Sequence, residues 1–406
     1  MSDRSRPVVA GLVTALVGTT SSFAVVLTGL RAVGASPVQA ASGLLLLLLT
    51  MGFGTVLISW RTRMPITIAW STPGAALLVG TGAVAGGWPA AVGAFVVTGL
   101  LITLTAVWPG LGAVIGKIPT ALAQAMLAGV LLSLCLAPVR AMISTPLLVL
   151  PVIVVWLVLL RVAPRWAVPV AFGAVLVIIA VLSSGPTATG VPGSVLPAPS
   201  WTTPTISIQA VISIAVPLYV VTMASQNVPG VAVLGSFGYR VPWRPAMAVT
   251  GVGTLIGAPF GGHTINLAAI SAALAASPDA DPDPRRRWVA AQTAGWAYVG
   301  LGLVSAGLVS VVARAPAGLV ETAAGLALLP TLGASLAGAL GQPTQRIPAL
   351  ATFLVAAGGV TVLGIGPAFW ALVAGMVSWF VLRPLTSPRG PAPRRARPAP
   401  TGRPTG

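Results

Sequence analysis

Two stretches of the chain decide its fold: PITIAWSTPGAALL, residues 65–78, and PFGGHTINLAAI, residues 259–270. In each stretch a proline ends one apolar run, a short β-branched or polar segment follows, and a second apolar run begins. Thr72 and Asn266 stand near the start of the second runs, and both residue types are favoured helix N-caps. We therefore expect an extended piece followed by a half-helix at each place; the alternative is a kink in an ordinary helix.

The composition places these stretches in a membrane protein. The chain has 406 residues, of which 56% are apolar and 7% are charged, and its mean hydropathy is +0.97. A soluble domain carries roughly 25% charged residues, so this chain cannot cover a surface that faces water. At about 20 residues per span, the length accommodates some fourteen spans and no soluble domain of normal size.

Apolar runs between proline, glycine and charged residues predict fourteen spans. Their approximate ranges are 8–30, 38–60, 66–83, 88–108, 118–136, 143–161, 166–182, 205–224, 243–257, 260–276, 287–313, 317–340, 346–363 and 366–383. The third and tenth are the two interrupted stretches. An uncharged stretch rich in Pro, Gly, Ser and Thr, residues 183–204, separates seven spans from seven and is predicted to be an external loop.

The Lys and Arg residues orient the chain. With the N-terminus in the cytoplasm, 19 of the 22 fall on the cytoplasmic side, and only Arg31, Arg140 and Arg314 fall outside. Cytoplasmic loops are enriched in positive residues, so we expect a multi-pass protein of the cell (inner or plasma) membrane with both termini cytoplasmic. The net charge of +17 also reflects the scarcity of acids, which are Asp3, Asp279, Asp281, Asp283 and Glu321.

Two charged segments are expected to face the cytoplasm. Residues 279–287 combine three aspartates with three arginines and are predicted to form a solvated turn. Residues 384–406 are rich in Pro and Arg and are predicted to be disordered. A basic tail beside anionic lipid is the preferred interpretation, and nucleic-acid binding is not expected.

The two sets of seven spans predict an inverted repeat. Because seven is odd, the second set would sit in the membrane with the opposite topology, as in many secondary transporters. A weak internal echo supports this, since MGFGTVLI at 51–58 recurs as TGVGTLIG at 250–257. The two half-helix N-termini would then meet near the midplane and favour an anion.

Polar residues inside apolar spans are the candidate site, because such residues are costly in lipid. Serines and threonines in a helix often bond back to their own backbone, whereas amides such as Gln226 and Asn227 need other partners. The candidate substrate-binding residues are Ser21, Ser22, Phe23, Trp70, Ser71, Thr72, Ser225, Gln226, Asn227, His263, Thr264, Ile265 and Asn266.

His263 is the only histidine. A lone histidine is commonly structural, but this one precedes an expected half-helix and no buried acid competes with it, so a proton-coupling role is the alternative. The sequence holds no nucleotide-binding motif, catalytic triad or zinc-ligand set, and Cys135 is the single cysteine. We expect no enzyme, no ATP-driven pump, no cofactor and no metal site.

Four segments resemble the benzoate/proton symporter (BenE) family: PFGGHTINLAAISAA at 259–273, PDPRRRW at 282–288, ASQNVPG at 224–230 and LGIGPAFW at 363–370. The similarity runs through nearly the whole chain. It implies a fold similar to uracil permease and the sulfate/anion transporters. That fold is an all-α polytopic protein with 14 transmembrane segments in two inverted seven-segment repeats, segments 3 and 10 each holding a short strand and a half-helix.

The resemblance also implies a core domain and a gate domain. The expected divisions are a cytoplasmic N-terminus (1–7), the first-repeat core (8–116) and gate (117–182), the external loop (183–204), the second-repeat core (205–313) and gate (314–383), and the basic tail (384–406). A homodimer is one assembly that the resemblance leaves open.

The function that the resemblance implies is import of benzoate, or a similar small aromatic carboxylate, together with a proton. We expect the carboxylate between the N-termini at Thr72 and Asn266, with Trp70 or Phe23 against the ring. A site without acids suits an anion, because a nearby carboxylate would repel it. The proton would be carried by His263 or would enter with the substrate.

Two other functions stay open. Members of the nucleobase branch use carboxylates in spans 8 and 10, where this chain has Ser225, Gln226, Asn227 and His263, so their proton mechanism does not carry over. An inorganic-anion or nucleobase carrier on the same fold is one alternative, and a non-transporting membrane scaffold is the other.

Overall fold

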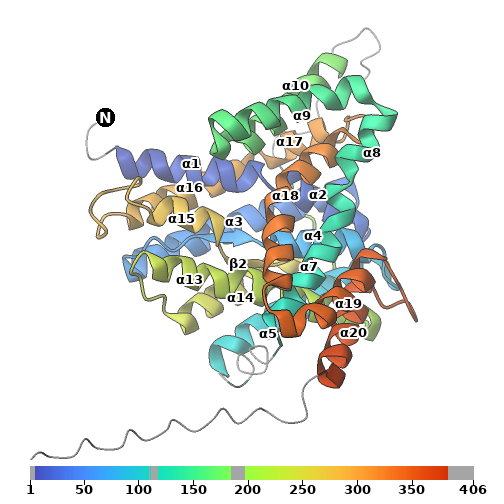
Figure 1. The fold of residues 1–406 in the computed structure, drawn as a ribbon. Coiled ribbons are helices and arrows are strands. Elements are labelled where there is room, and N and C mark those ends of the chain that lie inside the picture. The colour runs from blue at the N-terminus through green and yellow to red at the C-terminus, as the bar shows by residue number, and fades with distance from the viewer. Residues whose placement is uncertain (1–4, 109, 111–117, 184–196, 383–406) are drawn as a thin grey trace, which may run out of the picture.

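The computed structural model describes residues 5–108, 110, 118–183 and 197–382 (Figure 1). The predicted basic tail, and most of the predicted external loop, lie outside the described residues. Within the described part the chain is almost entirely helical, with one two-stranded sheet.

The first half of the chain contains nine helices and one strand among the described residues. They are α1 (Arg6–Thr20), α2 (Phe23–Ala32), α3 (Pro37–Thr62), β1 (Ile68–Trp70), α4 (Thr72–Thr81), α5 (Gly87–Val107), α7 (Thr120–Cys135), α8 (Ala137–Ser144), α9 (Pro146–Val162) and α10 (Pro164–Ser183).

The second half begins with a helix that two π-turns, Val211–Ala215 and Met223–Asn227, divide into α11 (Ile208–Ala210), α12 (Val216–Thr222) and α13 (Val228–Ser236). It continues with α14 (Trp243–Gly257), β2 (Ile265–Leu267), α15 (Ile270–Ala276), α16 (Trp288–Leu303), α17 (Ser305–Val312), α18 (Leu319–Leu340), α19 (Arg346–Ala357) and α20 (Pro367–Leu382).

The lengths and hydropathy of these helices make this a polytopic membrane protein. Seven helical stretches of the described residues are long and apolar enough to cross a bilayer: Arg6–Ala32, Pro37–Thr62, Gly87–Val107, Thr120–Ser144, Pro164–Ser183, Ile208–Ser236 and Leu319–Leu340. The pair α16 and α17, bent by 56°, makes an eighth if it counts as one span. The expected count of fourteen also includes shorter helices, and it stays a prediction.

Local sequence explains where several helices begin. At α3, Ser36 Oγ accepts a hydrogen bond from Gln39 N (3.3 Å) while Gln39 Oε1 accepts one from Ser36 N (2.9 Å), a capping box with Pro37 at the first helical position. At α18, Glu321 Oε2 accepts a hydrogen bond from Gly318 N (3.0 Å). The carboxylate therefore lies at the positive end of its helix, where it is stabilising.

The two interrupted stretches pair with each other in the middle of the molecule. β1 and β2 are antiparallel, with Ala69 opposite Asn266 at the centre. The ladder extends beyond the strands, since Ser71 N donates to Thr264 O (2.9 Å) and Ala268 N donates to Thr67 O (3.0 Å). Backbone groups that leave a helix inside an apolar interior need partners, and this sheet provides them.

The expected helix starts after these strands need correction. Helix α4 begins at Thr72, one residue earlier than an N-cap at Thr72 would place it, because Ser71 is the N-cap and its Oγ accepts from Gly74 N (3.1 Å). Asn266 is not an N-cap at all. It is the middle residue of β2, and α15 begins only at Ile270.

The two echoed segments pack alike against the sheet. A Cβ at Gly54 would lie 2.9 Å from Ile68 Cδ1 of β1, and a Cβ at Gly253 would lie 2.5 Å from Ile265 Cδ1 of β2. The next residue in each echo bonds the same strand position: Thr55 Oγ1 accepts from Ile68 N (2.9 Å), and Thr254 Oγ1 accepts from Ile265 N (3.2 Å). The two Gly-x-Gly-Thr segments therefore have equivalent roles.

The first glycine of each echo allows a close helix crossing. A Cβ at Gly52 of α3 would lie 2.7 Å from Gly295 O of α16. A Cβ at Gly251 of α14 would lie 2.6 Å from Thr103 N of α5. Small residues let membrane helices approach at the backbone, so the α3–α16 and α14–α5 crossings depend on these glycines.

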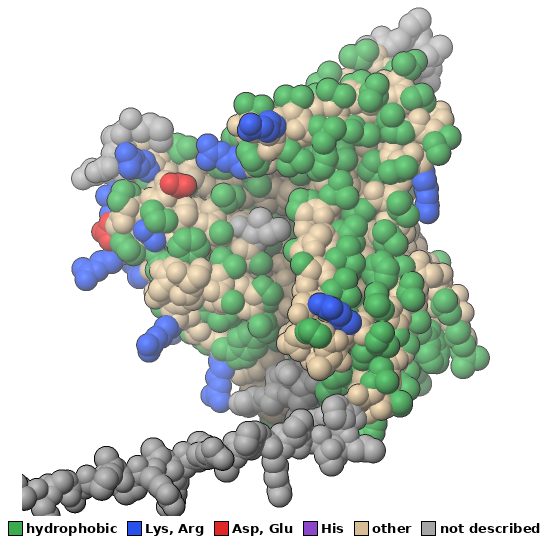
Figure 2. All heavy atoms as spheres, in the orientation of Figure 1, with side chains coloured by type: hydrophobic (Ala, Val, Ile, Leu, Met, Phe, Trp, Pro, Cys, Tyr) green, Lys and Arg blue, Asp and Glu red, His purple; other side chains and the backbone are tan. Residues whose placement is uncertain are grey.

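The helices form two packed groups. We call α1, α3, α5, α14 and α16 the α3 group, and α7, α9, α10, α18, α19 and α20 the α7 group, because the members of each pack mainly against one another. Figure 2 shows a groove between them, with α15 and α13 on one side and α18 on the other. The division into core and gate domains is compatible with this packing and is taken up below as a proposal.

The charged turn at residues 279–287 is solvated only in part, since Asp279 and residues 282–285 are exposed whereas Asp281 and Arg287 are buried. Arg287 is 5% exposed, and its guanidinium donates to the carbonyls of Ala276 (2.9 Å) and Asp281 (2.7 Å). Tyr239 Oη donates to Pro284 O (2.8 Å), and burial raises the pKa of Tyr239. Arg287 is buried because it satisfies carbonyls at the end of α15 and in the turn.

Candidate functional site

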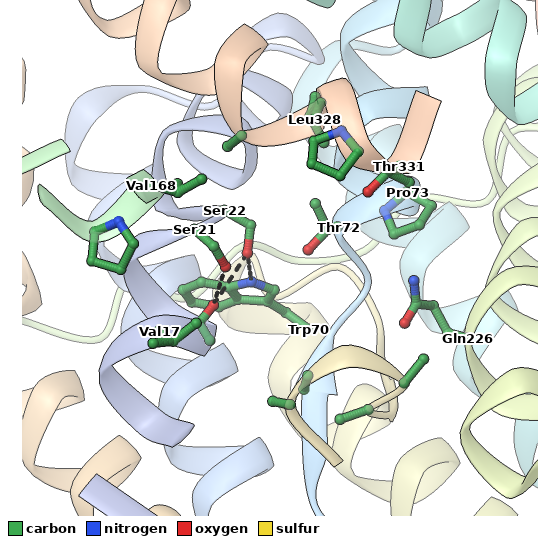
Figure 3. A pocket seen from close by; sticks show the side chains of 18 of the residues that line it. Val17, Ser21, Ser22, Trp70, Thr72, Pro73, Val168, Gln226, Leu328 and Thr331 are labelled. Carbon is green, nitrogen blue, oxygen red and sulfur yellow. Dashed lines mark hydrogen bonds between the residues drawn. The ribbon is translucent and has the colours of Figure 1, made fainter. Parts of the chain in front are cut away.

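A cavity of about 260 Å³ lies between the two helix groups. The α3-group side contributes α1, and the two broken stretches contribute β1, the start of α4 and the start of α15, while α10 and α18 form the opposite wall. Five of the predicted site residues line it: Ser21, Ser22, Trp70, Thr72 and Gln226. They come from three separate segments, which the fold brings together (Figure 3).

A second cavity of about 470 Å³ adjoins the first. Both are lined by Gln226, Ala269, Pro330 and Thr331. The second cavity extends between α7 and α18 and includes Ser225, another of the predicted residues. The two cavities together follow the groove between the groups.

Trp70 is fixed in place by the break in the first span. The chain leaves the α-helix between Thr20 and Phe23, and Ser22 Oγ then accepts a hydrogen bond from Trp70 Nε1 (2.7 Å). Ser21 and Ser22 also bond back to Gly18 O, at 3.2 and 3.3 Å, and Figure 3 shows all three bonds beside the indole. Ser22 therefore orients Trp70, and neither serine presents a free hydroxyl.

Several polar side chains of the cavity make no hydrogen bond with another described residue. The uncharged ones include the Thr72 hydroxyl, the Gln226 amide and the Thr331 hydroxyl. Thr72 is the first residue of α4, whose N-terminus carries a partial positive charge. Polar groups without a protein partner are the ones available to bind a ligand.

An apolar surface completes the cavity. Val17, Val168 and Leu328 line it together with Trp70, which is only 2% exposed (Figure 3). Small-molecule sites are mostly apolar, with a few placed polar groups, and typically measure roughly 300–1,000 Å³. At about 260 Å³, this cavity fits a small ligand with an apolar body and a polar end.

Other predicted residues are buried supports of the sheet. Ser71 Oγ, besides capping α4, is 3.0 Å from Thr222 Oγ1, which in turn is 3.4 Å from Thr264 Oγ1. Asn227 Oδ1 accepts from Leu267 N (2.8 Å) in β2. The amide of Asn227 therefore satisfies a strand backbone group, and it is not part of either cavity lining.

Four predicted site residues are buried outside both cavities. Phe23 is 1% exposed, and its ring centroid is 5.7 Å from that of Phe172 in α10. His263 is fully buried, and its ring lies nearly perpendicular to that of Phe95, with 6.5 Å between the centroids. Neither of its nitrogens has a hydrogen-bond partner among the described residues. Ile265 and Asn266 are buried in β2. None of these four residues lines either cavity.

The sequence analysis missed several residues that the fold brings to the cavity. Arg165 lines it from α10, Thr331 from α18 and Ser271 from α15. The sequence analysis placed Arg165 only among the 19 Lys and Arg residues on the cytoplasmic side. Pro330, inside α18, was the signal that could have pointed to Thr331, because a proline within a membrane helix disturbs the backbone next to it.

Comparison with known proteins gives one family. A family model described as benzoate membrane transport protein (BenE) matches residues 3–381. The inner membrane protein YdcO of Escherichia coli (strain K12) is 39% identical over 373 residues, covering 92% of this chain and 95% of that protein. The benzoate membrane transport protein of Acinetobacter baylyi is 28% identical over 340 residues, covering 80% and 82%.

Solved structures share the fold at low sequence identity. The transmembrane domain of the cyanobacterium bicarbonate transporter BicA matches with a TM-score of 0.59 and 14% identity, over 94% of this chain and 97% of that chain. The murine Solute Carrier 26 family member A9 anion transporter, in the inward-facing state, matches with a TM-score of 0.61 and 14% identity, over 93% and 68%. These similarities are to transporters rather than to enzymes.

Proposed function

Since the chain belongs to the BenE family of benzoate membrane transport proteins, we propose that it imports benzoate, or a similar aromatic monocarboxylate, together with a proton. Membership of this family shows that the protein is a membrane transporter. The substrate and the coupling are our proposal. The observation that carries it is the lining of the first cavity, which combines a fixed indole with the unpartnered side chains of Thr72, Gln226 and Thr331.

The substrate would lie with its ring against Trp70 and the apolar side chains around it. Its carboxylate would accept hydrogen bonds from Thr72, Gln226 and Thr331, near the N-terminus of α4. Charge-assisted hydrogen bonds to an ionised acceptor are stronger than neutral ones. The sequence analysis expected Asn266 to bind the carboxylate and Phe23 to contact the ring. Neither is part of the site proposed here, because both side chains are buried outside the cavity.

Transport would proceed by movement of a core against a gate. We propose fourteen segments in two inverted repeats, with segments 1–4 and 8–11 as core and segments 5–7 and 12–14 as gate. The matched contacts of the Gly-x-Gly-Thr segments support the repeat. The cavity lies where the α3 group meets α10 and α18, so relative movement of the groups would open and close it.

In the proposed topology the cavities open toward the cytoplasm. Both termini would be cytoplasmic, so Pro164 at the start of α10, Thr120 at the start of α7 and Gly338 near the end of α18 would lie on the cytoplasmic side. All three line a cavity. In Figure 2 most of the visible charged side chains gather at the end of the molecule where α1 begins, as positive-inside orientation requires.

Proton coupling has two proposed routes. His263 could carry the proton, although it precedes β2 whereas the cavity residues Ala268 and Ala269 follow that strand. The substrate could instead bring the proton on its own carboxyl group and lose it in the cavity, so that the anion is the form bound there. The separation of His263 from both cavities favours the second route.

An anion carrier of another specificity is the second candidate. Structures of the same fold are described as a bicarbonate transporter and an anion transporter, and the polar groups of the cavity suit any small anion. Calorimetric binding of benzoate, sulfate, bicarbonate and uracil to the purified protein distinguishes the two. We expect benzoate to bind tightest; tighter binding of an inorganic anion, or of uracil, would contradict the proposed substrate.

The oligomeric state is proposed to be a homodimer. Light scattering of the protein eluting from a size-exclusion column in detergent, corrected for bound detergent, measures the mass directly. A mass near twice that of the 40.6 kDa chain is the expected result, and a mass near that of one chain would overturn the dimer.

A further inference from the structure

Arg165 stands out among the residues that line the first cavity, because it is the one charged side chain among them. It lies in the first turn of α10, next to Pro164. No aspartate or glutamate of the described residues lines either cavity. The cavity wall on the α7-group side therefore carries an uncompensated positive charge.

The guanidinium of Arg165 does not help to stabilise the fold. It makes no hydrogen bond or ion pair with any described residue, whereas Arg287 binds carbonyls, Arg286 lies 3.6 Å from Asp281, and Arg63 stacks over Trp288 at 4.2 Å. A cation in the first turn of a helix also opposes the helix dipole. Arg165 therefore neither forms an ion pair with a described residue nor stabilises α10, so its presence at this position has another cause.

The cavity is small enough that any anion bound in it would interact electrostatically with Arg165. A compact space of about 260 Å³ is roughly 8 Å across, which is about one Debye length at physiological ionic strength. Clefts lined by one sign of charge concentrate ligands of the opposite sign and speed their association. Arg165 is itself exposed, so salt in the surrounding water weakens this effect.

We propose that Arg165 determines the charge specificity of the cavity: it attracts a small anion into the cavity and discriminates against neutral molecules of the same shape. The identity of the anion as an aromatic carboxylate rests on the function proposed above. Arg165 belongs to α10 and moves with the α7 group, so the anion contributes binding energy that favours the arrangement of the two groups in which Arg165 lines the cavity.

The test compares a charged ligand with a neutral isostere. Dissociation constants of benzoate and benzamide are measured by calorimetry for the wild-type protein and for Arg165→Gln, Arg165→Lys and Arg161→Gln. Arg161 is the matched control, because it is exposed at the end of α9 in the same predicted cytoplasmic turn and lines neither cavity.

We expect Arg165→Gln to raise the Kd for benzoate about fivefold, as expected for loss of a partly exposed charge pair, and to leave the Kd for benzamide unchanged. Arg165→Lys retains the charge and should restore most of the affinity. Arg161→Gln should resemble the wild type. The wild-type affinity for benzoate should also fall between about 0.05 M and about 0.5 M salt, and this measurement needs no variant.

Equal effects of Arg165→Gln and Arg161→Gln would overturn the inference, since both arginines would then serve only the topology. Salt-independent benzoate binding by the wild-type protein would overturn it as well. If the wild-type protein binds sulfate and no benzoate, the proposed function fails. Weaker sulfate binding by Arg165→Gln would still support the role of Arg165 in that case, and unchanged sulfate binding would refute both.

Discussion

At the scale of single residues, the site separates side chains that hold the cavity from side chains that face it. Ser22 and Trp70 form one such pair, because the serine hydroxyl is 2.7 Å from the indole nitrogen. Thr72, Gln226 and Thr331 have no such partners among the described residues. Orientation of the aromatic surface and recognition of the polar group are thus assigned to different residues.

Replacing Ser22 with alanine tests the orienting bond. Without its acceptor, the buried Trp70 Nε1 loses a hydrogen bond, and the free energy of unfolding should fall by about 1–3 kcal/mol. The Kd for benzoate should rise as the indole loses its fixed position. Thermal unfolding and ligand quenching of tryptophan fluorescence measure the two effects.

Ser21→Ala is the matched control, since Ser21 Oγ bonds only the backbone carbonyl of Gly18 among the described residues. This variant should remain close to the wild type in both measurements. A Ser22→Ala protein with wild-type benzoate affinity would show that the serine does not position the ring surface.

Replacing His263 with glutamine tests the route of the proton. Because His263 is buried away from both cavities, we expect the variant to keep the dependence of benzoate uptake on external pH. Uptake into vesicles is measured across a series of external pH values. Loss of the pH dependence in a variant that still binds benzoate would instead assign the proton to His263.

At the scale of elements, the antiparallel sheet organises the site, and the sequence predicted its place better than its details. The prolines and the polar segments after them predicted both interruptions. They did not predict where α15 begins, because Asn266 has a high local preference for an N-cap. Pairing of Ala268 N with Thr67 O keeps the chain extended past Asn266, and this tertiary pairing outweighs the local preference.

The cavity residues also show that local sequence does not predict tertiary contacts. Trp70, Thr72 and Gln226 were predicted because polar or aromatic groups interrupt apolar runs. Arg165 and Thr331 were not, because their place in the site depends on α10 and α18 packing against a distant break in the chain. Apart from Pro330 beside Thr331, such contacts leave no periodic or local signal in one sequence.

The close helix crossings give a prediction for the elements. Gly52→Ala and Gly251→Ala each place a methyl group against the backbone of the facing helix, at 2.7 and 2.6 Å. Such overpacking should cost about 1–3 kcal/mol in unfolding free energy, which lowers the melting temperature in detergent. If the two echoes are equivalent, the two variants should lose similar amounts.

Gly300→Ala on α16 is the control, because a Cβ there meets no other atom within 4 Å. Alanine is the better helix former, so this variant should match or exceed the stability of the wild type. A Gly52→Ala protein as stable as Gly300→Ala would contradict the close approach of α3 and α16.

At the scale of the whole molecule, the groove between the α3 group and the α7 group is the feature from which transport follows. Two adjoining cavities lie along it, and they share Gln226 and Thr331. In the proposed topology both cavities face the cytoplasm. The structure would then correspond to an inward-open arrangement, and an outward-open one would require the two groups to move.

Cysteine labelling tests this arrangement. Cys135 is the single native cysteine, so Thr331→Cys in a Cys135→Ser background introduces one thiol at the cavity. A membrane-impermeant maleimide should label it from the cytoplasmic side, and benzoate should slow the labelling. Labelling from the outside only, or labelling at the same rate with saturating benzoate, would contradict the proposed position of the site.

Transport in proteoliposomes tests whether this protein imports benzoate together with a proton. Purified protein is reconstituted, a pH gradient is imposed with the outside acidic, and accumulation of radiolabelled benzoate is compared with protein-free liposomes, which report passive entry of benzoic acid. We expect faster accumulation that collapses with a protonophore and is reduced by Trp70→Ala. Accumulation no faster than in protein-free liposomes, from protein that is folded and correctly inserted, would contradict the proposed import and would favour the membrane scaffold.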